Sequence, residues 1–424
     1  MNGLTPQAIT LAVYNKSCTQ FGVTWQTEVR ANPVLEYTDE ADTAFERAVR
    51  VEGACSDGTG TVKNTAVIRG VRPGEKCRWR VGDESGVFSD SAVFRAPELD
   101  EGKLTFLVMT DSQDGENRGE WLKFAWHDAV RRFPEARLLV NAGDIVQEGG
   151  SAEMWAQMFG INEEFLRSVP MAPVAGNHDY WYGYLHGFDA VCEKHFNIDL
   201  PPQDTRHGMY YSFDCGPAHF TVLSSGDSME TDGTGILSSQ LEWAENDIAS
   251  SDKPWKIVAV HNPLYSPGKY GCIDPIFGQA LGMQRQLDAL FVKYGVDLVL
   301  CGHDHVYAVT YPISADSLPV TDCVYETVCD GDGEIRYAVD PAGPIHFEAG
   351  CAGNQNREIE EGITERFSRN FADMSDMTYR AVAYAAVSID GGTLTVRYRE
   401  NSVDTGECVK YRAFGIKKAA KGND

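Results

Sequence analysis

The sequence has few basic residues for its size. Its 424 residues include 37 lysines and arginines against 62 aspartates and glutamates, which gives a formal net charge of -25. A surface with this excess of negative charge repels nucleic acids and anionic membranes, so we expect no nucleic-acid-binding surface. The same charge repels phosphate esters unless a site supplies strong local positive charge.

Long hydrophobic runs are also missing. No apolar run reaches the ~20 residues that span a bilayer, so we expect no membrane segment. The first residues, MNGLTPQAIT, lack the basic region and apolar core of a signal peptide. This predicts a cytoplasmic protein, or an extracellular one if a leader has been removed.

The 11 cysteines show no regular spacing, and we expect most of them to be reduced and buried. Cys323 and Cys329 are the one plausible pair for a local disulfide.

The chain divides into two unequal parts. Residues 1–97 contain short alternating strands such as AITLAVY and FGVTWQT, frequent turns and no helical pattern, which predicts an all-β sandwich. Residues 103–418 instead alternate apolar runs with helical segments such as NRGEWLKFAWHDAVRRF and GMQRQLDALFVKYG. That alternation predicts an α/β domain.

Five apolar runs of the second part end in polar residues that can bind metal. The runs are TFLVMTDSQ, LLVNAGD, PVAGNHD, KIVAVHN and VDLVLCGHDH, and the residues at their ends are Asp111, Gln113, Asp144, Asn177, His178, Asp179, His261, His303 and His305. In open α/β sheets, sites form outside the carboxyl ends of the strands. We therefore expect these side chains to meet at one sheet edge.

The residue types at these strand ends indicate the chemistry. Mixed imidazole and carboxylate donors suit Mn, Fe or Zn, and there are enough of them for two divalent ions. Two ions at ~3.5–4 Å can clamp a phosphoryl group and activate water. Their charge would also offset the repulsion between the acidic protein and a phosphate ester.

The order TDSQ, AGDIVQ, AGNHD, VAVHN and CGHDH resembles the calcineurin-like metallophosphoesterases, and within them the purple acid phosphatase branch. The N-terminal strands resemble the fibronectin type III-like domain of that branch. The resemblance covers roughly residues 5–415. It implies a four-layer α/β/β/α sandwich and hydrolysis of phosphate esters by in-line attack of water or hydroxide held by two metals.

The resemblance also implies a role for each residue. One metal would be held by Asp111, a bridging Asp144 and His305, and the other by Asp144, Asn177, His261 and His303. His303 and His305 would reach different metals, and Gly302 would let the backbone come close. His178 would act as general acid or transition-state donor. Asp179 is either its orienting partner or the cap of the following turn.

Two positions depart from the family pattern. Gln113 stands where the superfamily commonly has histidine, and it can offer an amide oxygen or hold a water. Gln147 stands where the purple branch has its tyrosinate ligand, which predicts a colourless protein unless Tyr180 or Tyr307 replaces that ligand. A non-catalytic scaffold that kept the fold is the alternative function. Arg206, His207 and the aromatic stretch 180–184 are further candidates for substrate contacts.

Overall fold

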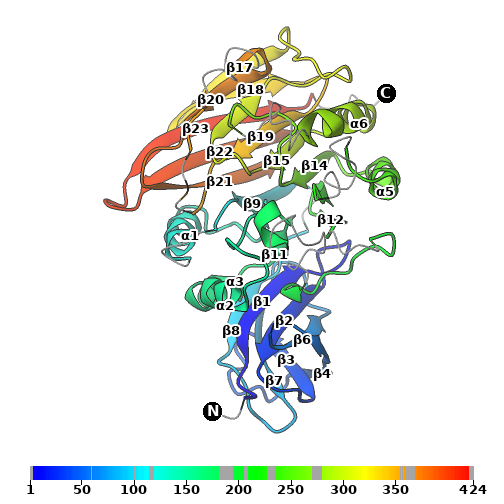
Figure 1. Ribbon diagram of the computed structural model, residues 1–424, viewed down its shortest axis with the longest axis vertical. Helices are drawn as coiled ribbons and strands as arrows, with labels where there is room; N and C mark the ends of the chain where they lie inside the picture. Colours follow the sequence, from blue (N-terminus) through cyan, green and yellow to red (C-terminus); the bar gives the residue numbers. More distant parts are fainter. Residues whose placement is uncertain are drawn as a thin grey trace.

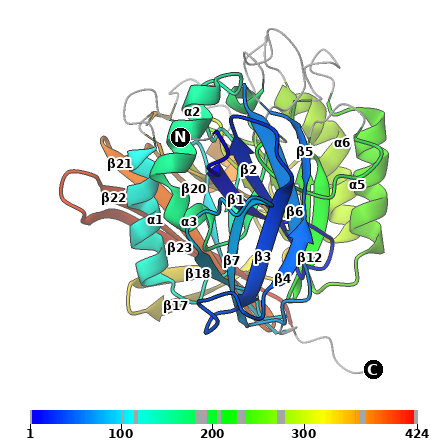
Figure 2. The same ribbon diagram turned by 90° about the horizontal axis from the view of Figure 1, so that it is seen from below.

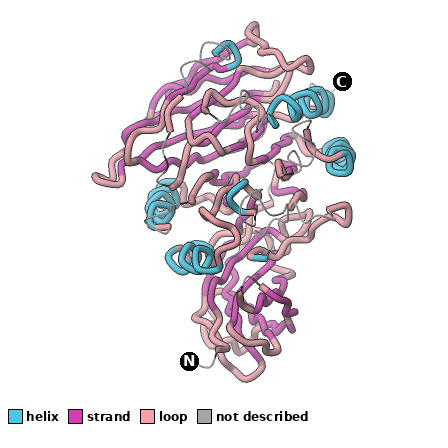
Figure 3. The backbone as a smooth tube through the Cα atoms, in the orientation of Figure 1, coloured by secondary structure: helices cyan, strands magenta, loops and turns pink. Residues whose placement is uncertain are grey.

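The computed structural model describes residues 3–58, 60–99, 102–113, 119–180, 194–204, 209–226, 235–269, 279–353, 355, 357–359 and 368–419. Strands dominate these residues, and the helices lie at the outside (Figure 3). The helices are α1 (Glu120–Arg132), α2 (Ala152–Ile161), α3 (Glu163–Leu166), α5 (Ser238–Ser250) and α6 (Gln279–Tyr294), with short 3-10 turns η1 (Asn177–Asp179) and η4 (Ser368–Asn370).

The largest sheet runs through most of the molecule. Its 12 strands are β1 (Gln7–Val13), β2 (Phe21–Thr27), β5 (Ala54–Asp57), β6 (Val62–Ile68), β9 (Lys103–Met109), β10 (Leu139–Asn141), β11 (Met171–Pro173), β17 (Val324–Asp330), β18 (Gly333–Val339), β21 (Ala381–Asp390), β22 (Thr393–Ser402) and β23 (Cys408–Lys417). They follow the order β17-β18-β23-β22-β21-β9-β10-β11-β1-β2-β6-β5.

Two smaller sheets face this one. The seven-stranded sheet has the order β12-β13-β14-β15-β19-β16-β20, and its strands are β12 (Tyr211–Cys215), β13 (Ala218–Leu223), β14 (Trp255–Val260), β15 (Leu298–Cys301), β16 (Tyr307–Thr310), β19 (Ile345–Ala349) and β20 (Phe371–Ser375). The four-stranded sheet, β4-β3-β7-β8, is built from β3 (Pro33–Asp39), β4 (Val49–Glu52), β7 (Lys76–Asp83) and β8 (Ala92–Arg95).

The C-terminal part is a four-layer sandwich, as predicted. One continuous apolar core lies between the 12- and seven-stranded sheets, where Phe106 of β9 meets Phe220 of β13 edge-on at 5.2 Å between ring centroids. Helix α1 packs on β21, whereas α5 packs on β13 and against α6. Seen from below, α1 and α2 lie on one side of the sheets and α5 and α6 on the other (Figure 2).

The N-terminal region is an all-β sandwich, also as predicted. Its core lies between the β1-β2-β6-β5 segment of the large sheet and the four-stranded sheet, and it buries Trp25 and Trp79. This region forms the lower, blue end of the molecule in Figure 1.

The two parts are more closely joined than the sequence indicates. Strand β1 pairs in parallel with β11 at Ala12 and Met171, so one hydrogen-bonded sheet runs through both. The indole N–H of Trp79 donates to the carbonyl of Arg167 at 3.2 Å, across the same junction. The domain division between residues 97 and 103 stays a prediction; β8 ends at Arg95 and β9 begins at Lys103.

None of the described helices is long and apolar enough to cross a membrane.

Candidate metal centre

The predicted residues follow strands of two sheets, not one. Asp111, Asp144 and Asn177 come after the parallel strands β9, β10 and β11 of the large sheet. His261 and the histidine pair come after the parallel strands β14 and β15 of the seven-stranded sheet. The expectation of a single sheet edge was therefore wrong. The carboxyl ends of both sheets meet because the sheets are stacked face to face.

The side chains form two groups of possible metal ligands. One group is Asp144, His261 and His303, and the other is Asp111, Asp144 and His305; within each group the ligand atoms lie within 4.8 Å of one another. Asp144 belongs to both groups. This is the place that the resemblance gives to a bridging carboxylate.

Asn177 closes the first group. Its Oδ1 lies 2.7 Å from Nδ1 of His303 and 3.1 Å from Nε2 of His261. Both Asn177 and His303 are half-buried, whereas Asp111, Asp144, His261 and His305 are buried almost completely. The centre therefore has a closed floor and opens on the side of Asn177 and His303.

Two histidines are held so that Nε2 faces the carboxylates. Nδ1 of His261 donates to the carbonyl of Ala142 at 2.9 Å, and its Nε2 lies 3.2 Å from Oδ2 of Asp144. Nδ1 of His305 donates to the carbonyl of Gln355, and its Nε2 lies 3.1 Å from Oδ1 of Asp111. A hydrogen bond from the second ring nitrogen is the usual support of a metal-bound histidine.

The backbone at this centre is strained. Four of the predicted ligands have positive φ: Asp111 (51°), Asp144 (54°), His303 (81°) and His305 (56°). This region is uncommon for residues other than glycine, and each such residue costs of order 1–3 kcal/mol, a strain that gathers at functional sites. The left-handed turns direct the side chains of the strand ends into a common space.

Gly302 has the role that the sequence predicts. A Cβ at this position would lie 2.0 Å from Oγ1 of Thr110 and 2.3 Å from Oδ2 of Asp111. Instead, the N–H of His303 comes within 2.9 Å of the same carboxylate oxygen. Only glycine lets the histidine segment pass this close to Asp111.

Gln113 provides a direct indication that the centre fits an ion. Its Nε2 lies 3.2 Å from Oδ2 of Asp144 and 3.4 Å from Nε2 of His305, and its Oε1 is buried with no hydrogen-bond partner. A buried amide oxygen without a partner is costly. If the side-chain amide of Gln113 were flipped, its oxygen would take the place of Nε2 and face an ion between Asp144 and His305. Together with the imidazole and carboxylate donors, Gln113 fits a divalent transition metal.

The buried carboxylates of the centre favour positive charge on the groups beside them. Burial acts to raise the pKa of Asp144, but the charges of His261, His178 and His303 and a hydrogen bond from His261 together outweigh it, so the pKa lies below its usual value. Burial acts to lower the pKa of His261, yet Asp144 raises it to about 9. Burial and the charge of His261 lower the pKa of His303 to about 3. The carboxylates draw protons onto the centre, and metal ions would compete for the same places.

His178 lies at the open side. Its Nδ1 donates to the backbone carbonyl of Gln147 at 2.8 Å, and its Nε2 lies 4.0 Å from Oδ2 of Asp144. Its side chain is 27% exposed. The ring therefore presents Nε2 to the space above the ligands, which is where a donor to a bound phosphate would have to be.

Asp179 has a different place. Its Oδ1 accepts the N–H of Ile145 at 2.9 Å, and its Oδ2 accepts the N–H of Gly176 at 2.9 Å. Burial, followed by the charge of Asp144, raises the pKa of Asp179 to about 7. The carboxyl group joins the loop after β10 to the loop after β11. These contacts are neither to the ring of His178 nor to a following turn, and a catalytic role for Asp179 stays a prediction.

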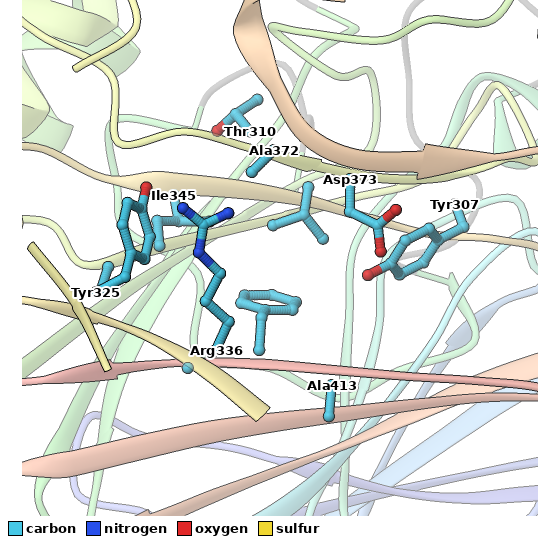
Figure 4. A pocket seen from close by; sticks show the side chains of 12 residues that line it. Tyr307, Thr310, Tyr325, Arg336, Ile345, Ala372, Asp373 and Ala413 are labelled. Carbon is cyan, nitrogen blue, oxygen red and sulfur yellow. The ribbon is translucent and has the colours of Figure 1, made fainter. Parts of the chain in front are cut away.

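The two tyrosines considered as replacement ligands have other partners. The hydroxyl of Tyr180 lies 2.8 Å from Oγ of Ser224. The side chain of Tyr307 lies beside Asp373, in a cavity of about 200 Å³ between the sheets that also contains Arg336 and Tyr325 (Figure 4).

Other predicted residues are accounted for as follows. Arg206, His207 and residues 181–184 lie outside the described residues. Cys323 and Cys329 are both free thiols, as are the other described cysteines, which agrees with the predicted reduced state. His195 is buried and stacks on Trp155 at 4.1 Å, as expected of a structural residue.

Three neighbours of the centre were not found from the sequence. Gln355 supports His305, Arg357 donates to the carbonyl of His303 at 3.0 Å, and Glu348 accepts the N–H of Asp304 at 3.1 Å. Glu348 lies on β19, which pairs with β15. The sequence places these residues about 40–55 positions after the histidine pair, and only the run HFEAGCAGN signalled that this segment matters.

The stacked sheets are similar to those of known metallophosphoesterases. Residues 104–307 match the family model described as calcineurin-like phosphoesterase, and they form a domain of that kind. The relatives of the chain are purple acid phosphatases and related acid phosphatases. Mouse acid phosphatase type 7 is 26% identical over 418 residues, which cover 92% of this chain and 86% of the mouse protein.

Other relatives match over shorter stretches. Phosphoenolpyruvate phosphatase of Allium cepa is 29% identical over 56% of this chain and 44% of its own length. The Arabidopsis thaliana protein named probable inactive purple acid phosphatase 1 is 27% identical over 64% of this chain and 42% of its own length. Among solved structures, purple acid phosphatase PPD1 of yellow lupin has a TM-score of 0.73 at 18% identity, covering 98% of this chain and 75% of that chain, which establishes the fold.

Proposed function

We propose that the protein is a binuclear metal-dependent phosphohydrolase that cleaves phosphate esters. The observation that carries this proposal is the shared position of Asp144 in both donor groups. A single tetrahedral ion needs about four ligands, whereas this carboxylate and the six other predicted donors make seven. Asp111, Gln113 and His305 would hold one ion with Asp144, and Asn177, His261 and His303 the other.

Two such ions would supply Lewis-acid charge and activate a water molecule. The residues of the chain do the rest. The buried carboxylates and the supported imidazoles keep the donors in place before substrate arrives. The mouth at Asn177, His178 and His303 leaves the phosphate one direction of approach. The positive charge of the two ions would offset the repulsion between a phosphate ester and a chain of net charge -25.

His178 would deliver the proton to the leaving group. Nδ1 is committed to the carbonyl of Gln147, so only Nε2 is directed to the substrate. The doubly protonated ring can donate from Nε2 while Nδ1–H keeps its bond to the carbonyl.

A non-catalytic scaffold is the competing function, and one relative has a name that says it is probably inactive. The presence of His178 and of the seven predicted donors favours the enzyme, although Gln113 and Gln147 depart from the family pattern. The test combines elemental analysis of protein reloaded with Mn, Fe or Zn with an activity screen across monoesters, diesters and pyrophosphate. Two ions per chain and turnover that Asp144→Asn abolishes would support the proposal. Two ions without turnover of any class would favour the scaffold.

A further inference from the structure

The side chain of Gln147 lies between two neighbours of the centre. Its Nε2 is 3.2 Å from Nδ1 of His178, and its Oε1 accepts a hydrogen bond from Nε2 of Gln355. Gln147 occupies the position where the resemblance expects a metal-bound tyrosinate. The amide of Gln147 therefore lies against His178, the residue that the proposed mechanism uses as proton donor.

Gln355 connects this amide to the second half of the centre. Its backbone carbonyl accepts the Nδ1–H of His305, while its side chain donates to Gln147. The segment before it lies against the first predicted ligand: the thiol of Cys351 and the N–H of Gly353 both approach the carbonyl of Asp111, at 3.1 and 2.9 Å. Gln355 is therefore placed by the same loop that closes over Asp111.

Nδ1 of His178 donates to the carbonyl of Gln147, so it can bond the side chain of Gln147 only through the amide oxygen of that side chain. With amide oxygen and nitrogen exchanged in both Gln147 and Gln355, which the same atom positions allow, a continuous chain of hydrogen bonds runs from His178, through the two glutamine side chains, to the segment that supports His305. His178 and His305 come from different sheets, after β11 and β15, and no strand pairing joins these two strands directly. The N–H of His178 donates to Oδ1 of Asp144 at 2.8 Å, which fixes the backbone of His178 at the centre. The imidazole ring of His178 still has to be held across the gap between the two sheets. The two glutamine side chains span that gap.

We propose that Gln147 and Gln355 are positioning residues that hold His178 in place relative to the ion bound by His305. This inference rests on the proposed function and extends it to residues that contact neither metal nor substrate. Supporting partners of metal-site histidines typically contribute about 10- to 100-fold. Here the loss should fall on proton delivery, because the backbone contact between Gln355 and His305 survives a change of the Gln355 side chain.

The main test is Gln355→Met, with Gln157→Met as the matched control. Gln157 lies on the exposed face of α2, where its amide bonds Glu153. For an alkyl phosphate, Gln355→Met should lower kcat about 10- to 100-fold, with KM and metal content unchanged. For p-nitrophenyl phosphate, whose leaving group needs little protonation, the loss should be much smaller. Gln157→Met should change neither rate.

A second readout does not depend on activity. With selective 15N-glutamine labelling, the side-chain amide of Gln355 is assigned by its disappearance in Gln355→Met. In metal-free protein, the side-chain amide resonance of Gln355 should shift in Gln147→Met, where the hydrogen-bond partner of Gln355 is missing. The same resonance should stay unchanged in Gln157→Met. An unchanged resonance would overturn the bridge even if the wild type is inactive.

The kinetic outcomes also separate the possibilities. Equal losses for both leaving groups, or loss of metal, would overturn the positioning role and indicate general support of the fold. Normal turnover of the alkyl phosphate would show that the bridge is inert. A wild type without turnover on either substrate would refute the proposed function, whereas the amide shift would still decide whether the bridge exists.

Discussion

The protein contains two buried groups of histidine and aspartate, and they differ in how fully their atoms are satisfied. In the group around His219, Nδ1 lies 2.7 Å from Asp214 and Nε2 lies 3.0 Å from Asp247. Asp247 also accepts the hydroxyls of Ser212 and Thr221. Each ring nitrogen has a carboxylate partner, so this group is a closed network.

The group around Asp144 is open by comparison. Within each of its two donor groups, the ligand atoms lie within 4.8 Å of one another. Four of its residues have a left-handed backbone conformation, and Oε1 of Gln113 has no hydrogen-bond partner. Residue type is the same in the two groups. The metal centre is distinguished by its left-handed backbone positions and by the partnerless amide oxygen of Gln113, whereas both ring nitrogens of His219 have carboxylate partners.

The largest expected effect is the loss of both metals in Asp144→Asn. The carboxylate serves both donor groups, so its neutralisation should lower kcat by more than about 10³-fold, which corresponds to the several kcal/mol that metal ions supply. Asp111→Asn should remove only one of the two ions, because Asp111 belongs to only one donor group. Elemental analysis and steady-state rates measure both. Two retained ions in Asp144→Asn would refute its place as a bridge.

The next effect is a loss of proton delivery in His178→Ala. We expect kcat to fall by about 10²–10⁴-fold for poor leaving groups, and less for nitrophenol, while metal content stays normal. Rates across a series of leaving-group pKa values measure this. A loss independent of the leaving group would indicate that His178 only positions the substrate.

The closed network should affect stability and not catalysis. Asp247 is buried, and removing one partner of a buried pair costs ~3–5 kcal/mol, so Asp247→Asn, which keeps the shape, should cost somewhat less. Metal content and kcat should be unchanged. Urea unfolding measures the stability, with the exposed His127→Gln as control. An Asp247→Asn protein of normal stability would contradict the closed network.

This network also predicts a pH dependence. Burial acts to lower the pKa of His219, but Asp214 and Asp247 raise it above 6.5, whereas hydrogen bonds and the charge of His219 lower the pKa of Asp247 below 3.8. The contribution of His219 is thus complete below pH 6.5 and is lost as pH rises through its higher folded-state pKa. That of Asp247 is present above pH 3.8 and is lost in acid. The destabilisation by His219→Gln should therefore shrink above pH 6.5; a constant difference up to pH 9 would contradict the linkage.

The smallest effect is an expected absence of colour. Tyr180 and Tyr307 have partners outside the donor groups, and Gln147 cannot donate phenolate charge. Iron-loaded wild type should show no strong visible band. Absorption spectra of wild type and Gln147→Tyr measure this. A strong band in the wild type would mean that a tyrosine reaches the metal after all.

Much of the candidate site could be predicted from the sequence. Each apolar run that stops in a donor residue marks the end of a buried strand, because a strand buried on both faces is a continuous apolar run. Gly302 could be predicted for the same local reason, since only glycine tolerates so close an approach. The helical spacing of residues 279–294 and the alternation in β1 and β2 are also properties of neighbouring residues along the chain.

Other predictions depended on contacts that a sequence does not contain. Asp179 stands beside His178 in the chain, yet its carboxyl group turns to the amides of Ile145 and Gly176. Gln355 lies 50 residues from His305 and reaches it through a carbonyl, which every residue has. Residue identity therefore could not reveal that contact.

The sequence by itself determined the two-part fold, the strand ends and the types of donor, because these follow from local hydrophobic pattern and side-chain chemistry. The tertiary structure alone decided that the donors come from two stacked sheets, that one sheet continues into the N-terminal sandwich through Ala12 and Met171, and that Gln147 faces His178. These features depend on pairing and packing between distant segments, whose free energy is a property of the whole fold.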